Sequence, residues 1–325
     1  MFAQNTEKAL PETSHSDARR PDRVAILLGT FNGAAFLAEQ LDSIEKQDYQ
    51  HWTLVASDDG SSDDTPAILA RFANRHTHRV EIRRGPSQGS FVANFRTLAC
   101  DSQIDAEFFA FCDQDDVWFP DKLTRALAVL ARQNPAVPAV YCGRTLIIDE
   151  AGEPRGYSPL FARRPSFRNA VIQSIGGGNT MVFNRAARDL LAKAPHANPV
   201  SHDWWTYQVV TAVGGTCHYD PVPAVAYRQH SANTMGANVG WLARILRAKM
   251  VVQGRFSEWT LQNLEALQSI EPLMTEKSRA TLRDIKGMRS PSLISRLRHL
   301  WQSGVYRQTV YGSIGLVGAV MFRRL

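Results

Sequence analysis

The alternation of apolar runs with helical patterns over the first 133 residues constrains the fold of this chain more than any other feature. Four short runs, VAILLG, WTLVAS, RVEIRR and EFFAFC, are each typical of a strand. Between them lie stretches whose apolar residues recur every three or four positions, as on one face of a helix. Such alternation predicts parallel strands joined by right-handed crossovers. We therefore predict an α/β fold, with a mostly parallel sheet and helices on both of its faces.

Polar side chains follow three of the predicted strands. Asn32 comes after the first strand, Asp58 ends the second, and Asp113, Asp115 and Asp116 follow the fourth. Ligands of open α/β sheets bind beyond the carboxyl ends of the strands. We therefore expect these side chains to line one crevice.

The run FCDQDDVW places three carboxylates directly after an apolar strand, where they repel one another. A cap for the following helix would need only one of them. A Mg²⁺ or Mn²⁺ ion accounts for the whole cluster, because such ions prefer carboxylate oxygens and share substrate phosphates. The spacing therefore favours a divalent metal. For Asp58 two interpretations stay open, a turn before a capped helix or an acceptor of hydrogen bonds from a nucleotide base or ribose.

The net charge of +6 is unevenly distributed along the chain. From Gly240 onward 14 Lys and Arg accompany 5 Asp and Glu, or +9, so residues 1–239 carry 23 against 26, or −3. The basic C-terminal region predicts contact with an anionic surface, and the negative main domain argues against nucleic acid in the crevice. Residues 1–22 form a polar leader without a signal-peptide core, and the four cysteines lack zinc spacing. Both features indicate a cytoplasmic setting.

Seven stretches follow one another in a fixed order over residues 24–236: TFNG, SDDGSSDDT, GSFVANF, CDQDDVWFPDKL, GGGNTMVF, SHDWW and YRQHSANTMG. In this order they resemble the bacterial family-2 glycosyltransferases, and most closely the rhamnosyltransferase-like branch that builds surface polysaccharide. The resemblance implies a Rossmann-like GT-A fold, a divalent metal and inversion at the anomeric carbon. It also implies a dTDP-, UDP- or GDP-sugar donor, rhamnose being the sugar of that branch. The implied acceptor is a saccharide, free or lipid-linked, in O-antigen or exopolysaccharide synthesis.

Carried over position by position, the resemblance implies a role for several side chains. Asp203 would be the catalytic base, and Asp115, Asp116 and His230 would meet the metal. The donor would contact Thr30, Asn32, Asp58, Arg84, Asn94, Asp113 and Arg228, and the acceptor would contact Gly177, Gly178, Asn179, Trp204 and Trp205. For the two tryptophans simple packing is the alternative to stacking on sugars, and for the glycines it is a plain turn.

The chain departs from the family pattern in two respects. His202 stands where many members carry Glu, so the acidic partner that would precede Asp203 is missing. The QxxRW motif and the long membrane spans of processive synthases are also missing, and we expect transfer of one sugar. Two alternatives stay open, a nucleotidyltransferase-like enzyme and a catalytically silent saccharide-binding module. The first lacks a basic glycine-rich turn after its first strand, and the intact acidic set argues against the second.

The C-terminal region predicts a basic helical appendage. WLARILRAKM has an apolar helical face, and the 15 residues from Gln308 to Phe322 carry no charge. A spanning helix needs ~20 residues, so we favour an interfacial segment at anionic lipid over a core or dimerisation helix. We predict a disordered leader over 1–22, a GT-A domain over 23–236 and a membrane-associating tail over 237–325. The protein would then be peripheral on the inner face of the cell membrane.

Overall fold

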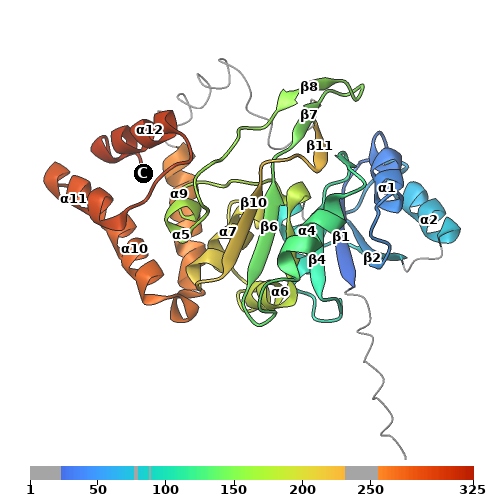
Figure 1. Ribbon diagram of the computed structural model, residues 1–325, viewed down its shortest axis with the longest axis horizontal. Coiled ribbons are helices and arrows are strands. Elements are labelled where there is room, and N and C mark those ends of the chain that lie inside the picture. The colour runs from blue at the N-terminus through green and yellow to red at the C-terminus, as the bar shows by residue number, and fades with distance from the viewer. Residues whose placement is uncertain (1–22, 77–79, 88, 231–254) are drawn as a thin grey trace, which may run out of the picture.

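A computed structural model describes residues 23–76, 80–87, 89–230 and 255–325. Its centre is a seven-stranded sheet in the order β10-β6-β9-β4-β1-β2-β3 (Figure 1). All neighbouring strands are parallel except β9, which runs antiparallel to β4 and β6. The predicted mostly parallel sheet is therefore confirmed. Its strands are β1 (Val24–Thr30), β2 (Trp52–Asp58), β3 (Val80–Arg84), β4 (Phe108–Cys112), β6 (Ala139–Gly143), β9 (Val182–Asn184) and β10 (Thr216–Asp220).

Helices cover both faces of this sheet, as the alternating pattern predicts. In β1, Ala25 and Leu27 pack into one hydrophobic cluster, and Ile26 and Leu28 pack into another. A strand that is buried on both faces reads as a continuous apolar run, which explains the sequence VAILLG. The helices are α1 (Leu37–Glu45), α2 (Thr65–Arg75), α3 (Phe91–Cys100), α4 (Lys122–Leu130), α5 (Phe167–Ala170), α6 (Arg185–Ala192) and α7 (His202–Ala212), with a 3-10 turn, η1 (Gly178–Thr180).

A second, four-stranded sheet lies at the carboxyl ends of the main strands. It has the order β5-β11-β7-β8, and β7 and β8 form an antiparallel hairpin around Glu150 to Gly152 (Figure 1). Its strands are β5 (Val117–Trp118), β7 (Leu146–Ile148), β8 (Pro154–Tyr157) and β11 (Val225–Arg228). Because β5 follows the DQDD motif directly and pairs with β11, this sheet ties that motif to the YRQH stretch.

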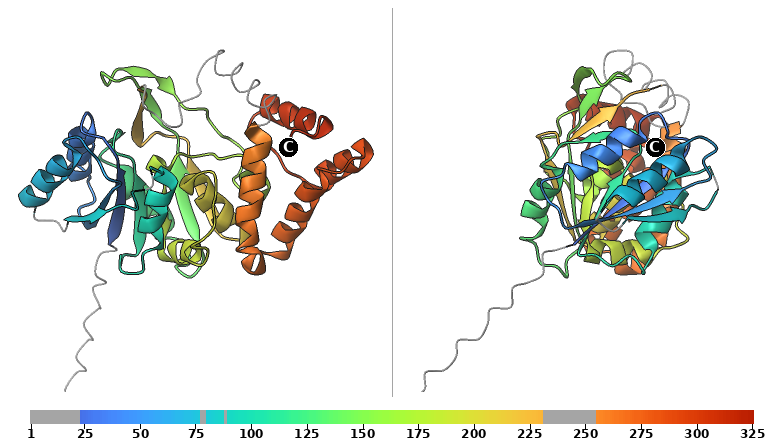
Figure 2. Two further views of the ribbon diagram at one scale, coloured as in Figure 1. Left: turned by 180° about the vertical axis from the view of Figure 1, so that it is seen from behind. Right: turned by 90° about the vertical axis from the view of Figure 1, so that its right-hand side faces the viewer.

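The C-terminal region is helical, as predicted. Leu267, Ile285 and Val320 belong to the same hydrophobic cluster as α7, so these helices pack on one side of the main domain (Figure 2). Its elements are α9 (Arg255–Gln268), η2 (Glu271–Leu273), α10 (Glu276–Gly287), α11 (Leu293–Ser303) and α12 (Val310–Met321). In the described ranges no helix has both the length and the apolar character needed to cross a membrane. The predicted leader 1–22 and the WLARILRAKM stretch lie outside the described residues.

Candidate active site

The loops after β1 and β2 meet through one hydrogen-bond network. The Thr30 hydroxyl donates to Asp58 Oδ1 at 2.9 Å, and the backbone N–H of Ser61 donates to Asp58 Oδ2 at 2.9 Å. The backbone N–H of Asn32 donates to Ser61 Oγ at 2.8 Å, while Asn32 itself has a left-handed φ of 47°. The structure thus brings the predicted donor residues Thr30, Asn32 and Asp58 together. Ser61 was missed, although a serine three residues after an aspartate is a turn signal.

The DQDD loop after β4 is fastened to the loop after β1 by Gln114. Its amide accepts from the backbone N–H of Phe31 at 2.8 Å and donates to the Phe31 carbonyl at 2.9 Å. A Cβ at Gly33 would lie 2.2 Å from Gln114 Oε1, so only glycine leaves room for this clamp. The sequence predicted roles only for the carboxylates of this motif, and the structural role of Gln114 was not predicted.

Asp113 is a half-buried carboxylate that faces other carboxylates. Burial raises its pKa well above the ordinary range, and repulsion by Asp116, Asp115 and Asp203 raises it further. Asp203, in the first turn of α7, is half-buried, and its Oδ1 accepts the backbone N–H of Trp204 at 2.7 Å. The structure therefore gathers the DQDD carboxylates and the predicted base at one place, which is an environment that favours a cation.

Asp115 and His230 face each other across the site. Asp115 Oδ2 lies 2.7 Å from His230 Nε2, and the imidazole packs beside the Phe36 ring at 5.0 Å. Two neighbouring ligand atoms on an octahedral ion, with bonds of about 2.1 Å, lie about 3 Å apart. Carboxylate oxygens suit Mg²⁺ and Mn²⁺, and imidazole suits transition-metal ions, so the pair is compatible with a divalent cation such as Mn²⁺.

The described ranges hold no set of three or more His, Cys, Asp or Glu side chains arranged to bind a metal. Mg²⁺ sites often have only one or two protein carboxylates, with substrate phosphates and water completing the coordination, so Asp115 as the single carboxylate ligand is compatible with such a site.

Asp116 has no exposed surface, and each of its oxygens accepts a hydrogen bond from within the protein. Oδ2 accepts from the Asn179 amide, and Oδ1 accepts from the backbone N–H of Arg228 at 3.0 Å. Burial raises the pKa of Asp116 to about 8, and repulsion by Asp115 adds to the effect. Asp116 and Asn179 therefore brace each other, which corrects the predicted metal contact of Asp116 and the predicted acceptor contact of Asn179.

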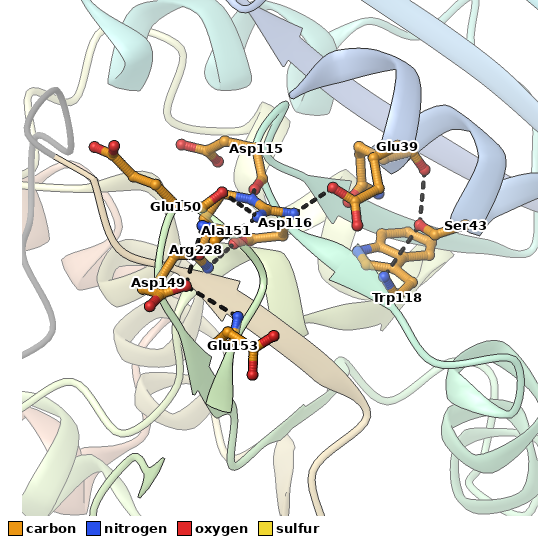
Figure 3. Close-up of polar contacts among 11 residues, drawn as sticks. Glu39, Ser43, Asp115, Asp116, Trp118, Asp149, Glu150, Ala151, Glu153 and Arg228 are labelled. Atoms are coloured by element: carbon orange, nitrogen blue, oxygen red, sulfur yellow. Dashed lines mark hydrogen bonds and ion pairs between the residues drawn. The ribbon is translucent and has the colours of Figure 1, made fainter. Parts of the chain in front are cut away.

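Arg228 is the hub of the site's support (Figure 3). Although 98% of its surface is buried, its Nε donates to the Asp115 carbonyl at 3.0 Å and its Nη1 to the Glu150 carbonyl at 3.0 Å. Its Nη2 forms an ion pair with Glu39 of α1. The guanidinium is buried and makes its contacts within the protein, which corrects the predicted contact with the donor diphosphate. Glu39 was missed, since nothing in the sequence distinguishes it from other helix-surface acids.

Asn94 of α3 and Arg84 of β3 both lie beside the carboxyl end of β2. Asn94 is buried, and its Nδ2 donates to the Ser57 carbonyl at 2.9 Å while its Oδ1 accepts from the Ser57 hydroxyl. It supports the strand end, which corrects its predicted donor contact. Arg84 stands opposite Asp58 in the β2–β3 register and is exposed, so its predicted role at the donor stays a prediction.

The two tryptophans of α7 pack inside the protein. Trp204 and Trp205 are 7% and 2% exposed, and Trp204 Nε1 donates to the Ala170 carbonyl at 2.6 Å. Neither offers a ring face to a sugar, which corrects their predicted acceptor contacts and matches the alternative of simple packing.

His202 and the glycine turn lie together beside Asp203. The imidazole of His202 stacks on Phe95 at 4.1 Å, and a Cβ at Gly178 would lie 2.4 Å from its Nε2. Burial lowers the pKa of His202 to about 4, so the ring is neutral at neutral pH. Gly178 is thus buried against His202, while Gly177 is exposed next to it. Contact of either glycine with an acceptor stays a prediction.

Comparison with known proteins gives a consistent result. Residues 25–191, just over half of the chain, match the family model described as Glycosyl transferase family 2. The dTDP-rhamnosyl transferase RfbG of Shigella flexneri is 28% identical over 236 residues, covering 69% of this chain and 78% of that protein. The UDP-Glc:alpha-D-GlcNAc-diphosphoundecaprenol beta-1,3-glucosyltransferase WfgD of Escherichia coli is 28% identical over 112 residues, covering 34% of this chain and 42% of that protein.

Solved structures share the fold at low sequence identity. S. aureus TarS 1-349 in complex with UDP-GlcNAc has a TM-score of 0.53 at 14% identity, covering 87% of this chain and 93% of that chain. GalNAc-T7 with UDP, GalNAc and Mn²⁺ also has a TM-score of 0.53, at 10% identity, covering 95% of this chain and 57% of that chain.

Proposed function

The chain belongs to glycosyl transferase family 2 and has the GT-A fold, and we propose that it transfers one sugar from a nucleotide-diphosphate donor, with inversion, to a saccharide acceptor. The observation that carries this proposal is the pair Asp115–His230, 2.7 Å apart, beside the half-buried carboxylates of Asp113 and Asp203. A binding module would not need such a costly set of neighbouring acids.

The donor site we propose runs along the ends of β1, β2 and β4. Asp58 accepts from the hydroxyls of Thr30 and Ser61 at Oδ1 and from the Ser61 N–H at Oδ2, so Oδ2 keeps a lone pair for a nucleotide base or ribose. Asp115 and His230 would hold Mg²⁺ or Mn²⁺. When bound, the cation shares the donor's phosphate oxygens and neutralises the charge of the leaving diphosphate.

Asp203 is the base in this proposal. Its carboxylate lies in the first turn of α7, next to the positive end of the helix dipole. One oxygen accepts the Trp204 N–H, and the other is left to take the proton of an acceptor hydroxyl. Inversion needs one such base and no protein nucleophile, a role that Asp203 can fill alone.

The sugar, acceptor and location are proposed from the relatives and from charge. RfbG is named a dTDP-rhamnosyl transferase, and WfgD is named for a diphosphoundecaprenol-linked acceptor. We extend these names to a rhamnose donor and a lipid-linked acceptor in bacterial surface polysaccharide synthesis. The charge of +9 from Gly240 onward supports a peripheral position on the cytoplasmic face of the cell membrane.

The test is a thermal-shift screen of UDP-, GDP- and dTDP-sugars, each with Mn²⁺ and with EDTA. One nucleotide should raise the melting temperature only with the metal, and it should then serve as donor when bacterial lipid extract supplies the acceptor. The screen is repeated with Asp115→Asn, which should lose the metal-dependent stabilisation. The matched control is Asp121→Asn, which changes an acid of the same segment whose side chain is 50% exposed. Metal-dependent binding without transfer would indicate a silent saccharide-binding module, and no stabilisation at all would overturn the proposal.

A further inference from the structure

The outer faces of α11 and α12 are unusually apolar. Of the eighteen large apolar side chains exposed in the described part of the chain, ten lie between Leu293 and Phe322. Monomeric proteins rarely expose such side chains in continuous patches unless the patch binds something. The concentration of these residues in two neighbouring helices therefore calls for a partner.

The exposed side chains form one stripe on each helix. On α11, Ile294, Leu297 and Trp301 recur at helical spacing. On α12, Ile314 lies at the centre of a similar stripe of exposed apolar side chains. The full α12 stripe consists of Val310, Tyr311, Ile314, Val317 and Met321. The opposite face of α12 packs on the protein through Leu316, Ala319 and Val320. The helix α11 is therefore amphipathic, with Arg296 and Ser303 buried on its inner side, whereas α12 is apolar on both sides and only its inner side is covered by the protein.

The surroundings of the stripes are basic. Residues 285–325 contain seven Lys and Arg and no Asp or Glu. Arg298 stands within the α11 stripe, and Arg323 and Arg324 lie just beyond the end of α12, all three exposed. Apolar stripes edged by arginine, tryptophan and tyrosine are typical of helices that lie in the headgroup region of a bilayer.

The position of α12 relates this surface to the active site. In both ribbon views α12 lies at the same end of the molecule as β7 and β8 (Figures 1 and 2), which is the end toward which the main strands run. Its 12 residues span about 18 Å, whereas a bilayer core measures about 30 Å. The helix can therefore lie on a bilayer but cannot cross one.

We propose that the outer faces of α11 and α12 dock the protein on an anionic lipid bilayer, with the crevice turned toward the lipid. This inference rests on the proposed function, because a lipid-linked acceptor would present its sugar at that surface. Apolar burial supplies the attachment, and the arginines select anionic headgroups.

A second copy of the chain is the competing occupant, because Gly312, Gly315 and Gly318 could let another helix approach closely. The two possibilities differ at Gly315, where an added Cβ would meet no atom within 4 Å. Gly315→Leu adds apolar area to a lipid-facing stripe but blocks the close approach of a second helix. The same substitution should therefore strengthen bilayer binding and weaken a glycine-packed dimer.

The experiment is co-sedimentation of the full chain with vesicles of phosphatidylglycerol and phosphatidylethanolamine, compared with phosphatidylcholine alone. We expect binding to the anionic vesicles, weakened by salt. The double variant Trp301→Asp/Ile314→Asp should lower it about tenfold or more, and Gly315→Leu should raise it. Leu273→Asp, which changes an apolar side chain 42% exposed in η2 outside these two helices, should leave it unchanged.

Three results would overturn the inference: no preference for anionic vesicles, equal loss in Leu273→Asp, or a dimer in light scattering that Gly315→Leu dissociates. The binding needs neither donor nor acceptor, so it is independent of catalysis. Thermal shift with nucleotide sugars and Mn²⁺ on the same samples reports the crevice and the folding of each variant. Vesicle binding without nucleotide stabilisation would contradict the proposed function alone, and the reverse would contradict the docking surface alone.

Discussion

The DQDD loop and the C-terminal helices depart from the usual distribution of side chains in opposite directions. The loop buries charge, since Asp116 has no exposed surface and Asp113 is half-buried among other acids. The helices α11 and α12 expose apolar groups, and Ile294, Trp301 and Tyr311 each keep more than 80% of their surface accessible. Each arrangement sacrifices folding free energy, through repulsion in the first and unused apolar burial in the second.

The two regions differ in the support that they need. The DQDD loop is held by Gln114, Asn179 and Arg228 through hydrogen bonds from three directions, because chemistry requires fixed atomic positions. The exposed stripes need only a continuous face on a stable helix, since apolar attraction has no preferred direction. A reactive site is therefore recognised by the hydrogen bonds that hold its side chains in place, and a docking surface by the apolar side chains that it exposes.

The largest effect is expected for Asp203→Asn. Loss of the base should lower sugar transfer by about two to four orders of magnitude, while the metal-dependent thermal shift with the donor stays as in the wild type. Transfer of labelled sugar into lipid extract and the thermal shift measure the two quantities, with Asp121→Asn as control. If donor binding disappeared as well, Asp203 would be a donor ligand or a structural residue.

Arg228→Met tests whether Arg228 stabilises the protein more than an exposed arginine does because it is buried. The substitution leaves the carbonyls of Asp115 and Glu150 without their donor, whereas Glu39 is 56% exposed and can be solvated. We expect the free energy of unfolding to fall by about 2 to 5 kcal/mol. Arg155→Met is the matched control, since Arg155 also pairs with an acid of the small sheet but is 62% exposed. Its loss should cost at most about 1 kcal/mol in urea denaturation. Similar costs for both variants would refute the special role of Arg228.

His202→Phe tests whether the buried imidazole makes the stability of the fold sensitive to acid. Because the folded pKa of about 4 lies below the ordinary value of about 6.5, folding excludes the protonated ring. The stability this provides is complete above pH 6.5 and is lost as the pH falls toward 4, by about 3 kcal/mol. Phenylalanine fits the cage of Phe95 and Phe111 and should flatten that part of the stability profile in urea titrations. An unchanged slope would show that other groups cause the acid sensitivity.

Asp115→Asn should have the smallest effect in free energy. We expect it to remove the Mn²⁺-dependent stabilisation by the nucleotide sugar, which is about 2 to 3 kcal/mol at a ligand concentration near 100 times Kd. Calorimetric titration with Mn²⁺ and with EDTA measures the loss, and Asp121→Asn again serves as control. Unchanged titration would separate the Asp115–His230 pair from metal binding and leave it as a structural contact.

Much of the fold and part of the site could be predicted before any coordinates. The alternating periodicity located the strands and helices of the main domain, because strand and helix periods follow from backbone geometry. Asp115 and His230, 115 positions apart, were expected at one place and lie 2.7 Å from each other. The predictions failed where a side chain could turn either way, as with Trp204, Asn94 and Arg228, which all turn into the protein.

The order of the motifs indicated the family, and local periodicity and residue type predicted the order of the elements and the end of the sheet at which the acids gather. Which polar groups stay available to a ligand depends on the tertiary structure. Their availability depends on partners distant in sequence, such as Glu39 for Arg228 and Asn179 for Asp116. A buried polar group must satisfy its hydrogen bonds wherever the fold supplies them, and local sequence does not record where that is.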